Sequence, residues 1–237
     1  MLDSRWVFVV IFLFSGLSGL IYESIWTHYL KLFLGHAAYA QTLVLAIFMG
    51  GMAIGAFLCA KLVHRWSKVI LYYAIVEAII GVAALLFHPI FVQFVDVSFN
   101  SIIPSLSDPS AINSYKWVAA ALLVLPQSIL LGMTFPLLTT GITRLYPNKI
   151  GETIAILYFS NSLGGAIGVL VSGFILIKSI GLPGTMAFAG TINLVLALLV
   201  YSLVKRYQLN REPAEINKHI ISPASESAGT KDSSRIQ

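Results

Sequence analysis

The stretch SGLSGLIYESIWTHYL, residues 15–30, decides the fold, because a glycine-spaced apolar run typical of a helix in lipid carries a single acid, Glu23. It belongs to the first of six apolar runs, each as long as the roughly 20 residues that a helix needs to cross a bilayer. The sequence therefore predicts an all-α polytopic membrane protein. The expected spans are residues 6–30, 41–62, 69–92, 117–142, 153–177 and 183–204.

The composition supports a membrane protein and limits the chemistry. Hydrophobic residues make up 57% of the 237 residues, charged residues only 11%, and the mean hydropathy is +0.85. A soluble domain carries about 25% charged residues. Cys59 is the sole cysteine and lies within a span, which excludes disulfides and thiolate metal sites. The five histidines are scattered, and no phosphate-binding or dinucleotide motif occurs. We therefore predict neither a metal nor a cofactor.

The distribution of basic residues predicts the orientation. With the N-terminus placed in the cytoplasm, twelve Lys and Arg residues lie inside and three outside, the latter being Lys31, Lys116 and Lys178. This is the positive-inside pattern. We expect an integral protein of the bacterial inner membrane with both termini cytoplasmic. Topology accounts for the net charge of +5, so no nucleic-acid partner is predicted. Residues 1–206 form the transmembrane domain, and the polar residues 207–237 a disordered cytoplasmic tail.

An internal similarity links the second and fifth spans. GGMAIGAFL (50–58) is similar to GGAIGVLVSG (164–173). Such a match is expected if three helices are followed by an inverted copy of three, the plan of each half of a major-facilitator transporter. Two unrelated glycine-rich helices in lipid would also give it, because small residues let helices approach closely. Both interpretations stay open.

Two acids within spans are the first candidates for function. A charge inside a bilayer costs roughly 2.5–3.5 kcal/mol on insertion scales, so it normally faces the bundle interior. Glu77 lies near the middle of the third span, and Glu23 lies toward the outer end of the first. Cation binding or proton exchange would explain both. A protonated buried Glu77, and a Glu23 hydrogen-bonded to Trp26 or His28, are the structural alternatives.

Further candidates surround a possible cavity. Asn161, next to Tyr158 in the fifth span, is the best polar group for orienting a ligand, and His28 and Trp26 accompany Glu23 at the outer side. Two prolines, Pro126 and Pro136, predict a bent fourth helix that could line the cavity. The cytoplasmic loop between the second and third spans carries basic residues. They either only set the orientation of the protein in the membrane or also take part in gating. These are Lys61, Arg65 and Lys68.

Four motifs, in order, resemble the membrane region of integral-membrane spermidine synthase-like proteins, in which major-facilitator-like helices are fused to an aminopropyltransferase. They are SGLSGLIYESIWTHYL (15–30), FMGGMAIGAFLCAKLVHR (48–65), LLGMTFPLL (130–138) and LYFSNSLGGAIGVLVSGFILIKSIGLPGT (157–185). His28 stands where that family usually has Arg. The resemblance implies a membrane region without the family's soluble catalytic domain, and so an expectation that this chain is not itself an enzyme.

Two functions follow from the resemblance. The leading one is a non-enzymatic membrane module that binds or transports a small solute, with polyamine or a related cation as the implied ligand and a homodimer as the expected assembly. The alternative is an anchor or scaffold for a separately encoded aminopropyltransferase or another cytoplasmic enzyme.

Overall fold

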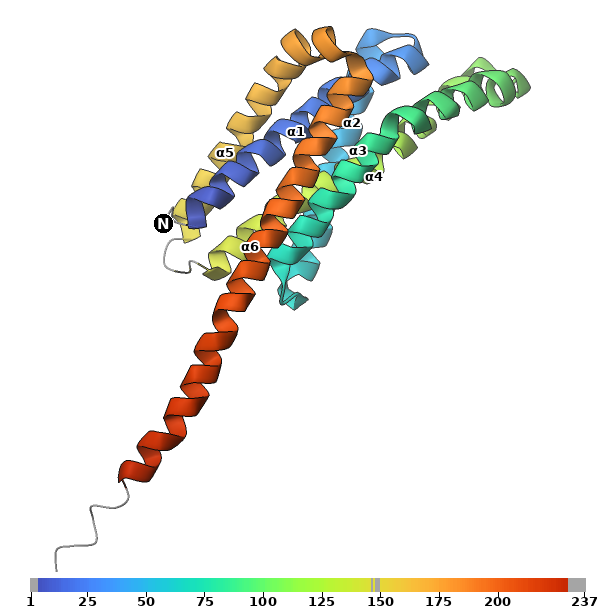
Figure 1. Cartoon of the computed structure of the whole chain (residues 1–237). Helices are drawn as coiled ribbons and strands as arrows, with labels where there is room; N and C mark the ends of the chain where they lie inside the picture. Colours follow the sequence, from blue (N-terminus) through green and yellow to red (C-terminus); the bar gives the residue numbers. More distant parts are fainter. Residues whose placement is uncertain (1–3, 146, 148–149, 230–237) are drawn as a thin grey trace, which may run out of the picture.

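The protein is a bundle of long helices (Figure 1). The computed structural model describes residues 4–145, 147 and 150–229, with the backbone alone for 4–5 and 207–229. The described residues confirm the prediction of an all-α chain. Its helices are α1 (Ser4–Leu34), α2 (Ala37–Leu62), η1 (Val63–Arg65), α3 (Val69–Val97), η2 (Ser98–Ile102), η3 (Ile103–Ser105), α4 (Pro109–Leu145), α5 (Ile150–Val171), η5 (Ser172–Leu176) and α6 (Ile177–Gly229).

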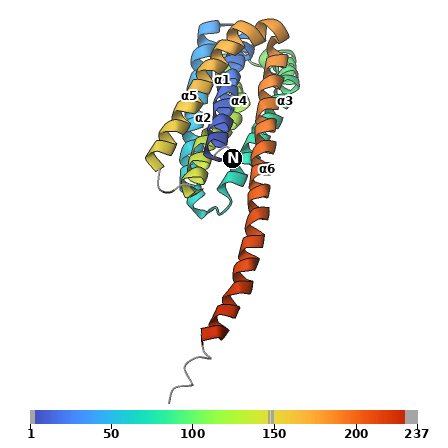
Figure 2. The ribbon, with the colours of Figure 1, turned by 60° about the vertical axis from the view of Figure 1, so that its left-hand side comes forward.

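Within the described residues, five helical segments are long and apolar enough to cross a membrane, where the sequence predicts six spans. The difference lies in the last segment, Ile150–Arg206, which joins α5, η5 and α6. It reverses direction at Gly181, so that α5 and α6 run in opposite directions on either side of α1, which contacts both (Figures 1 and 2). Gly181 has φ 68° and ψ −178°, a conformation open only to glycine. Gly181 is thus a kink between two helical stretches and lies between residues 177 and 183, where the sequence predicts one span to end and the next to begin.

The fourth helix extends beyond the predicted membrane span at its N-terminal end. The sequence places the span at 117–142, and α4 begins at Pro109. Asp108 caps this helix: its Oδ1 accepts a hydrogen bond of 3.2 Å from the Ser110 backbone N–H, and its Oδ2 accepts one from the Ser110 hydroxyl. These hydrogen bonds hold the pKa of the Asp108 carboxyl below its usual value. Proline at the first helical position completes a strong start signal.

Helix packing in the bundle depends on glycine. The most extensive contacts join α1 with α5, α2 with α4 and α3 with α6. At the first of these a Cβ on Gly164 would lie 1.9 Å from the Leu13 carbonyl oxygen, and at the second a Cβ on Gly55 would lie 1.9 Å from that of Ile129. Only glycine fits at such distances. Between spans in lipid, close packing replaces the hydrophobic effect as the force that holds helices together.

The interior is centred on α1, the most buried of the five segments. The prediction of a transmembrane domain ending at residue 206 and a disordered tail over 207–237 stays a prediction, because the side chains of 207–229 and the whole of 230–237 lie outside the described residues.

Candidate functional site

A cavity of about 320 Å³ lies between four helices. Ser15 on α1 is about 14 Å along the helix from Trp6, and Thr134 on α4 is about 17 Å from Leu145, so each lies about half of a 30 Å hydrocarbon thickness from that end of its apolar segment. Tyr158, a lining residue, is 65% exposed, so this chain does not close the cavity by itself. Its lining residues are Ser15, Gly16, Gly19, Leu20, Phe48, Met52, Ala56, Leu131, Gly132, Thr134, Phe135, Tyr158 and Asn161.

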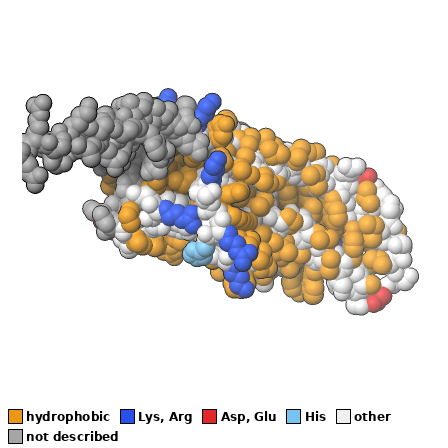
Figure 3. Space-filling view, turned by 90° about the horizontal axis from the view of Figure 1, so that it is seen from below, with side chains coloured by type: hydrophobic (Ala, Val, Ile, Leu, Met, Phe, Trp, Pro, Cys, Tyr) orange, Lys and Arg blue, Asp and Glu red, His pale blue; other side chains and the backbone are white. Residues whose placement is uncertain are grey.

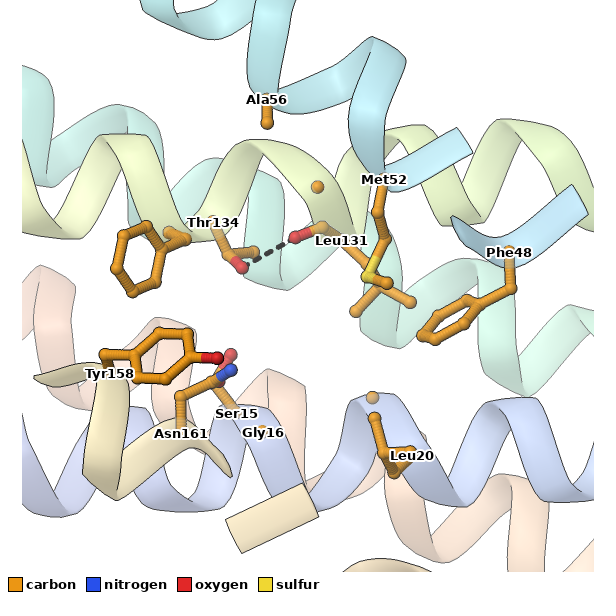
Figure 4. A pocket seen from close by; sticks show the side chains of 13 residues that line it. Ser15, Gly16, Leu20, Phe48, Met52, Ala56, Leu131, Thr134, Tyr158 and Asn161 are labelled. Atoms are coloured by element: carbon orange, nitrogen blue, oxygen red, sulfur yellow. Dashed lines mark hydrogen bonds between the residues drawn. The ribbon is translucent and has the colours of Figure 1, made fainter. Parts of the chain in front are cut away.

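The polar groups of the cavity converge from α1, α4 and α5. Tyr158 and Asn161 extend from α5 toward the same space, opposite Thr134 (Figure 4). Thr134 donates its hydroxyl hydrogen to the Leu131 carbonyl, at 2.7 Å. Of the described residues, those that line the cavity include no acid, base or histidine. A ligand therefore meets aromatic rings, hydroxyl groups and an amide, not a formal charge.

The prolines of α4 bracket the lining segment. Pro126 and Pro136 both lie inside α4, which is nevertheless a single helix from Pro109 to Leu145. Leu131 to Phe135, between the two prolines, provides the α4 side of the cavity. Each proline removes one backbone donor and leaves a carbonyl without its usual partner. The sequence suggested that the fourth helix could line a cavity, and α4 does line one.

Glu77 lies directly behind the cavity wall. It is fully buried, and its Oε1 accepts a hydrogen bond of 2.6 Å from Ser15, which lines the cavity. Its Oε2 accepts a hydrogen bond from the Asn193 amide of α6. The Tyr22 hydroxyl donates to Asn193 Oδ1, at 2.6 Å, and so fixes the amide with its N–H groups toward Glu77. The carboxyl group thus joins α1, α3 and α6 within the bundle.

Tyr73 is the second buried phenol near this carboxyl group. Its side chain is fully buried beside Glu77, yet its hydroxyl makes no hydrogen bond of regular geometry. Sequence reasoning missed Ser15 and Asn193 as neighbours of Glu77, because they lie on α1 and α6, whose registers against α3 a single sequence does not specify. Tyr73 was also missed, although it precedes Glu77 by four residues on the same helix, a spacing that places both on one face. For Asn193, the available signal was that it is a rare amide within an apolar run.

The structure does not bring the two membrane acids into one cavity. Glu23 is half-buried and does not line the cavity at Ser15. Trp26 and His28 do not bind its carboxylate: the buried Trp26 Nε1 has no hydrogen-bond partner, and His28 Nδ1 lies 2.8 Å from the Ser24 carbonyl. Trp26 packs behind the cavity, 6.1 Å from Phe48 between ring centroids, while His28 is exposed.

The basic loop is held by a residue that the sequence did not single out. Lys61, Arg65 and Lys68 are all exposed. Arg144, at the end of α4, instead donates hydrogen bonds to the backbone carbonyls of Trp66 (2.6 Å) and Val63 (3.1 Å). The guanidinium group therefore ties the α2–α3 connection to α4. No group of three His, Cys, Asp or Glu side chains suited to a metal ion occurs in the described part of the chain.

Comparison with known proteins gives a family and two relatives. Residues 99–230 match the family model described as Major Facilitator Superfamily. A protein named polyamine aminopropyltransferase from Corynebacterium efficiens is 28% identical over 87% of this chain, and one of the same name from Oceanobacillus iheyensis is 26% identical over 81%. This chain spans 37% and 34% of the lengths of those two proteins. No solved structure matches it significantly.

Proposed function

The chain belongs to the Major Facilitator Superfamily, and from this premise we propose that it is a membrane module that binds or transports a small solute through the cavity between α1, α2, α4 and α5. The observation that carries the proposal is the position of Glu77: a fully buried carboxyl group, one hydrogen bond behind Ser15, at a cavity open to the outside of the chain. Burial of an ionisable group in a membrane span usually accompanies function.

We propose six passes through the membrane. At 1.5 Å per residue, the 57 residues of Ile150–Arg206 would extend about 85 Å as a straight helix, nearly three times the hydrocarbon thickness. The reversal at Gly181 would divide this length into two crossings. An even number of crossings places both termini on one side, and the excess of Lys and Arg makes that side the cytoplasm.

The contacts between helices support a three-plus-three repeat. In such a repeat, α1, α2 and α3 correspond to α4, α5 and α6. The α1–α5 pair then corresponds to the α4–α2 pair, and the α3–α6 pair corresponds to itself. These are the three most extensive pairs in the bundle. Glycines provide the close approach in each: Gly164 in the first, Gly55 in the second, and Gly81 against Gly190 in the third.

A polyamine or related cation is the proposed ligand. The cavity offers the rings of Phe48, Phe135 and Tyr158, whose faces attract an ammonium group. When Ser15 donates to Glu77, the lone pairs of its oxygen remain available to a donor in the cavity. The acid thereby supplies negative charge without touching the solute. The Asn161 amide and the Tyr158 hydroxyl would orient the ligand.

A second copy of the chain would complete the site. Polar groups at an open cavity in the hydrocarbon region would otherwise face acyl chains, which is unfavourable. We therefore propose a homodimer that covers the open side at Tyr158.

Uptake into proteoliposomes tests the proposal. Purified protein is expected to accumulate labelled spermidine. Asn161→Leu should reduce uptake about tenfold, the effect of losing one charge-assisted hydrogen bond to the ligand. Glu77→Gln should also reduce uptake, because it removes the negative charge behind Ser15. Glu23→Gln is the matched control, because Glu77 accepts a hydrogen bond from the lining residue Ser15, whereas Glu23 does not. No uptake or binding by the wild-type protein, or equal loss in the control, would refute the role of the cavity.

The names of the two relatives favour a second candidate function, that of a membrane anchor for a separately encoded aminopropyltransferase. Under this proposal a soluble synthase would be retained on the purified chain, retention would survive Glu77→Gln, and it would be lost on deletion of residues 207–237. Retention that is unaffected by the deletion would argue against the tail as the docking segment.

A further inference from the structure

A second cavity, a groove of about 300 Å³, lies between α1 and α6 and plays no part in the proposed solute site. Its walls are apolar, with Val10 and Phe14 on α1 and Phe188, Val195 and Leu199 on α6. Thr191, its one hydroxyl-bearing residue, donates to the Ala187 carbonyl of its own helix. The groove therefore offers a ligand shape and dispersion contacts but no polar partner.

The length of the groove matches one leaflet of a bilayer. Phe188 and Leu199 mark its ends on α6, and eleven residues at 1.5 Å correspond to about 16 Å along the helix. Half of a 30 Å hydrocarbon core is about 15 Å. If the groove were empty, the side chains of its walls would have no van der Waals contacts on that side. One acyl chain fits its length and its chemistry.

The end of the groove carries groups suited to a phospholipid headgroup. Arg206, exposed on α6, follows Leu199 by seven residues and Phe188 by eighteen, so it lies on the groove face of the helix about 10 Å beyond the groove. Trp6, 53% exposed, precedes Val10 by one turn on α1. Tryptophan and basic side chains at this depth are typical of the membrane interface.

The charge of the molecule is concentrated at this same end. Figure 3 shows Lys and Arg side chains at one end of the molecule, whereas the visible acidic side chains lie at the opposite end. Lys205 adds a second exposed cation beside Arg206. Because basic groups near the surface attract anionic lipids, the headgroup that this end favours is negatively charged.

We propose that the groove between α1 and α6 is a binding site for one anionic phospholipid, with an acyl chain along Val195 and Leu199 and the phosphate near Arg206. The lipid would fill the space between α1 and α6 and so support the packing of α1, which carries Ser15.

Native mass spectrometry of the full chain in detergent tests this proposal, with phosphatidylglycerol and phosphatidylcholine as probes. The wild-type protein is expected to retain one phosphatidylglycerol in preference to phosphatidylcholine. Arg206→Gln should weaken phosphatidylglycerol binding about fivefold and leave phosphatidylcholine unchanged. Val195→Trp, which fills the groove, should weaken both. Lys178→Gln, at the other end, and Val169→Trp, on the exposed face of α5, are the matched controls.

Equal binding of the two lipids would overturn the proposal, and so would equal effects of Val195→Trp and Val169→Trp on lipid binding. A lipid-free dimer that Val195→Trp dissociates would also overturn it, because the groove would then bind a second copy of the chain. If Val195→Trp does not fold, Thr191→Trp at the exposed rim fills the same space and is read in the same way.

Discussion

Ser15 on α1 and Glu77 on α3 are joined by a hydrogen bond of 2.6 Å, although 62 residues separate them in the chain. Ser15 also lines the central cavity, so this single hydrogen bond connects the cavity with a fully buried carboxyl group. The same contact ties the first helix to the third.

Ser15→Ala is expected to destabilise the fold by roughly 1–2 kcal/mol, because Glu77 Oε1 loses its donor inside the bundle. Ser18→Ala is the control: Ser18 is as buried, but its hydroxyl binds only the Ser15 carbonyl of the same helix. Equilibrium unfolding in mixed micelles measures both. Equal stabilities of the two variants would show that the Ser15–Glu77 hydrogen bond adds nothing.

Two glycines on α2 should respond oppositely to alanine. A Cβ at Gly55 would lie 1.9 Å from the Ile129 carbonyl oxygen, so Gly55→Ala is expected to force α2 and α4 apart and to cost about 1–3 kcal/mol. Nothing lies within 4 Å of a Cβ at Gly50, and Gly50→Ala should be neutral or stabilising by up to about 1 kcal/mol. Thermal unfolding of the detergent-solubilised variants compares them. A Gly50→Ala variant that unfolds as early as Gly55→Ala would instead place a partner helix at this face.

Arg144→Gln should loosen the connection between α2 and α3. The variant loses the hydrogen bonds to the Val63 and Trp66 carbonyls, and the local opening free energy should fall by roughly 1–3 kcal/mol. Faster amide exchange over residues 63–68, measured by mass spectrometry, is the expected result. Arg65→Gln, an exposed base in the same loop, should leave the exchange unchanged; a similar acceleration there would point to net charge as the cause.

Single cysteines in a Cys59→Ala background test the number of crossings. Six passes require that Ser107→Cys and Ser179→Cys react with a membrane-impermeant maleimide from outside intact cells, and that Ser67→Cys reacts only after lysis. Ser179 precedes the reversal at Gly181 and is therefore the decisive position. If Ile150–Arg206 crossed only once, Ser179 would lie within the bilayer and remain unlabelled from either side.

The location of the membrane helices follows from the sequence because it depends on local properties. An apolar run of about 20 residues identifies a helix regardless of its neighbours, and the described residues contain five long apolar helical segments where the sequence predicts six spans. The glycines of the second and fifth runs also indicated close packing correctly, since Gly55 and Gly164 lie at the tightest approaches. The helix α4 begins eight residues before the predicted span, at the Asp108–Pro109 cap.

The candidate site was predicted only in part. Tyr158 and Asn161 do line the cavity, and Glu77 lies one hydrogen bond behind it, but Glu23 and His28 do not reach it. The sequence indicated how far along its predicted span each of the two acids lies. It could not specify the rotation of each helix, on which the direction of a side chain depends.

By itself, then, the sequence determined that the chain enters a bilayer, where its apolar runs lie and which of them pack through glycine, because transfer to lipid and close approach depend on residue type. The tertiary structure alone decided that Glu77 meets Ser15 and Asn193, that Arg144 holds the α2–α3 connection, and that α1 and α6 leave an apolar groove. Those contacts depend on the register and rotation of helices that are distant in the chain, and only the packed bundle sets them.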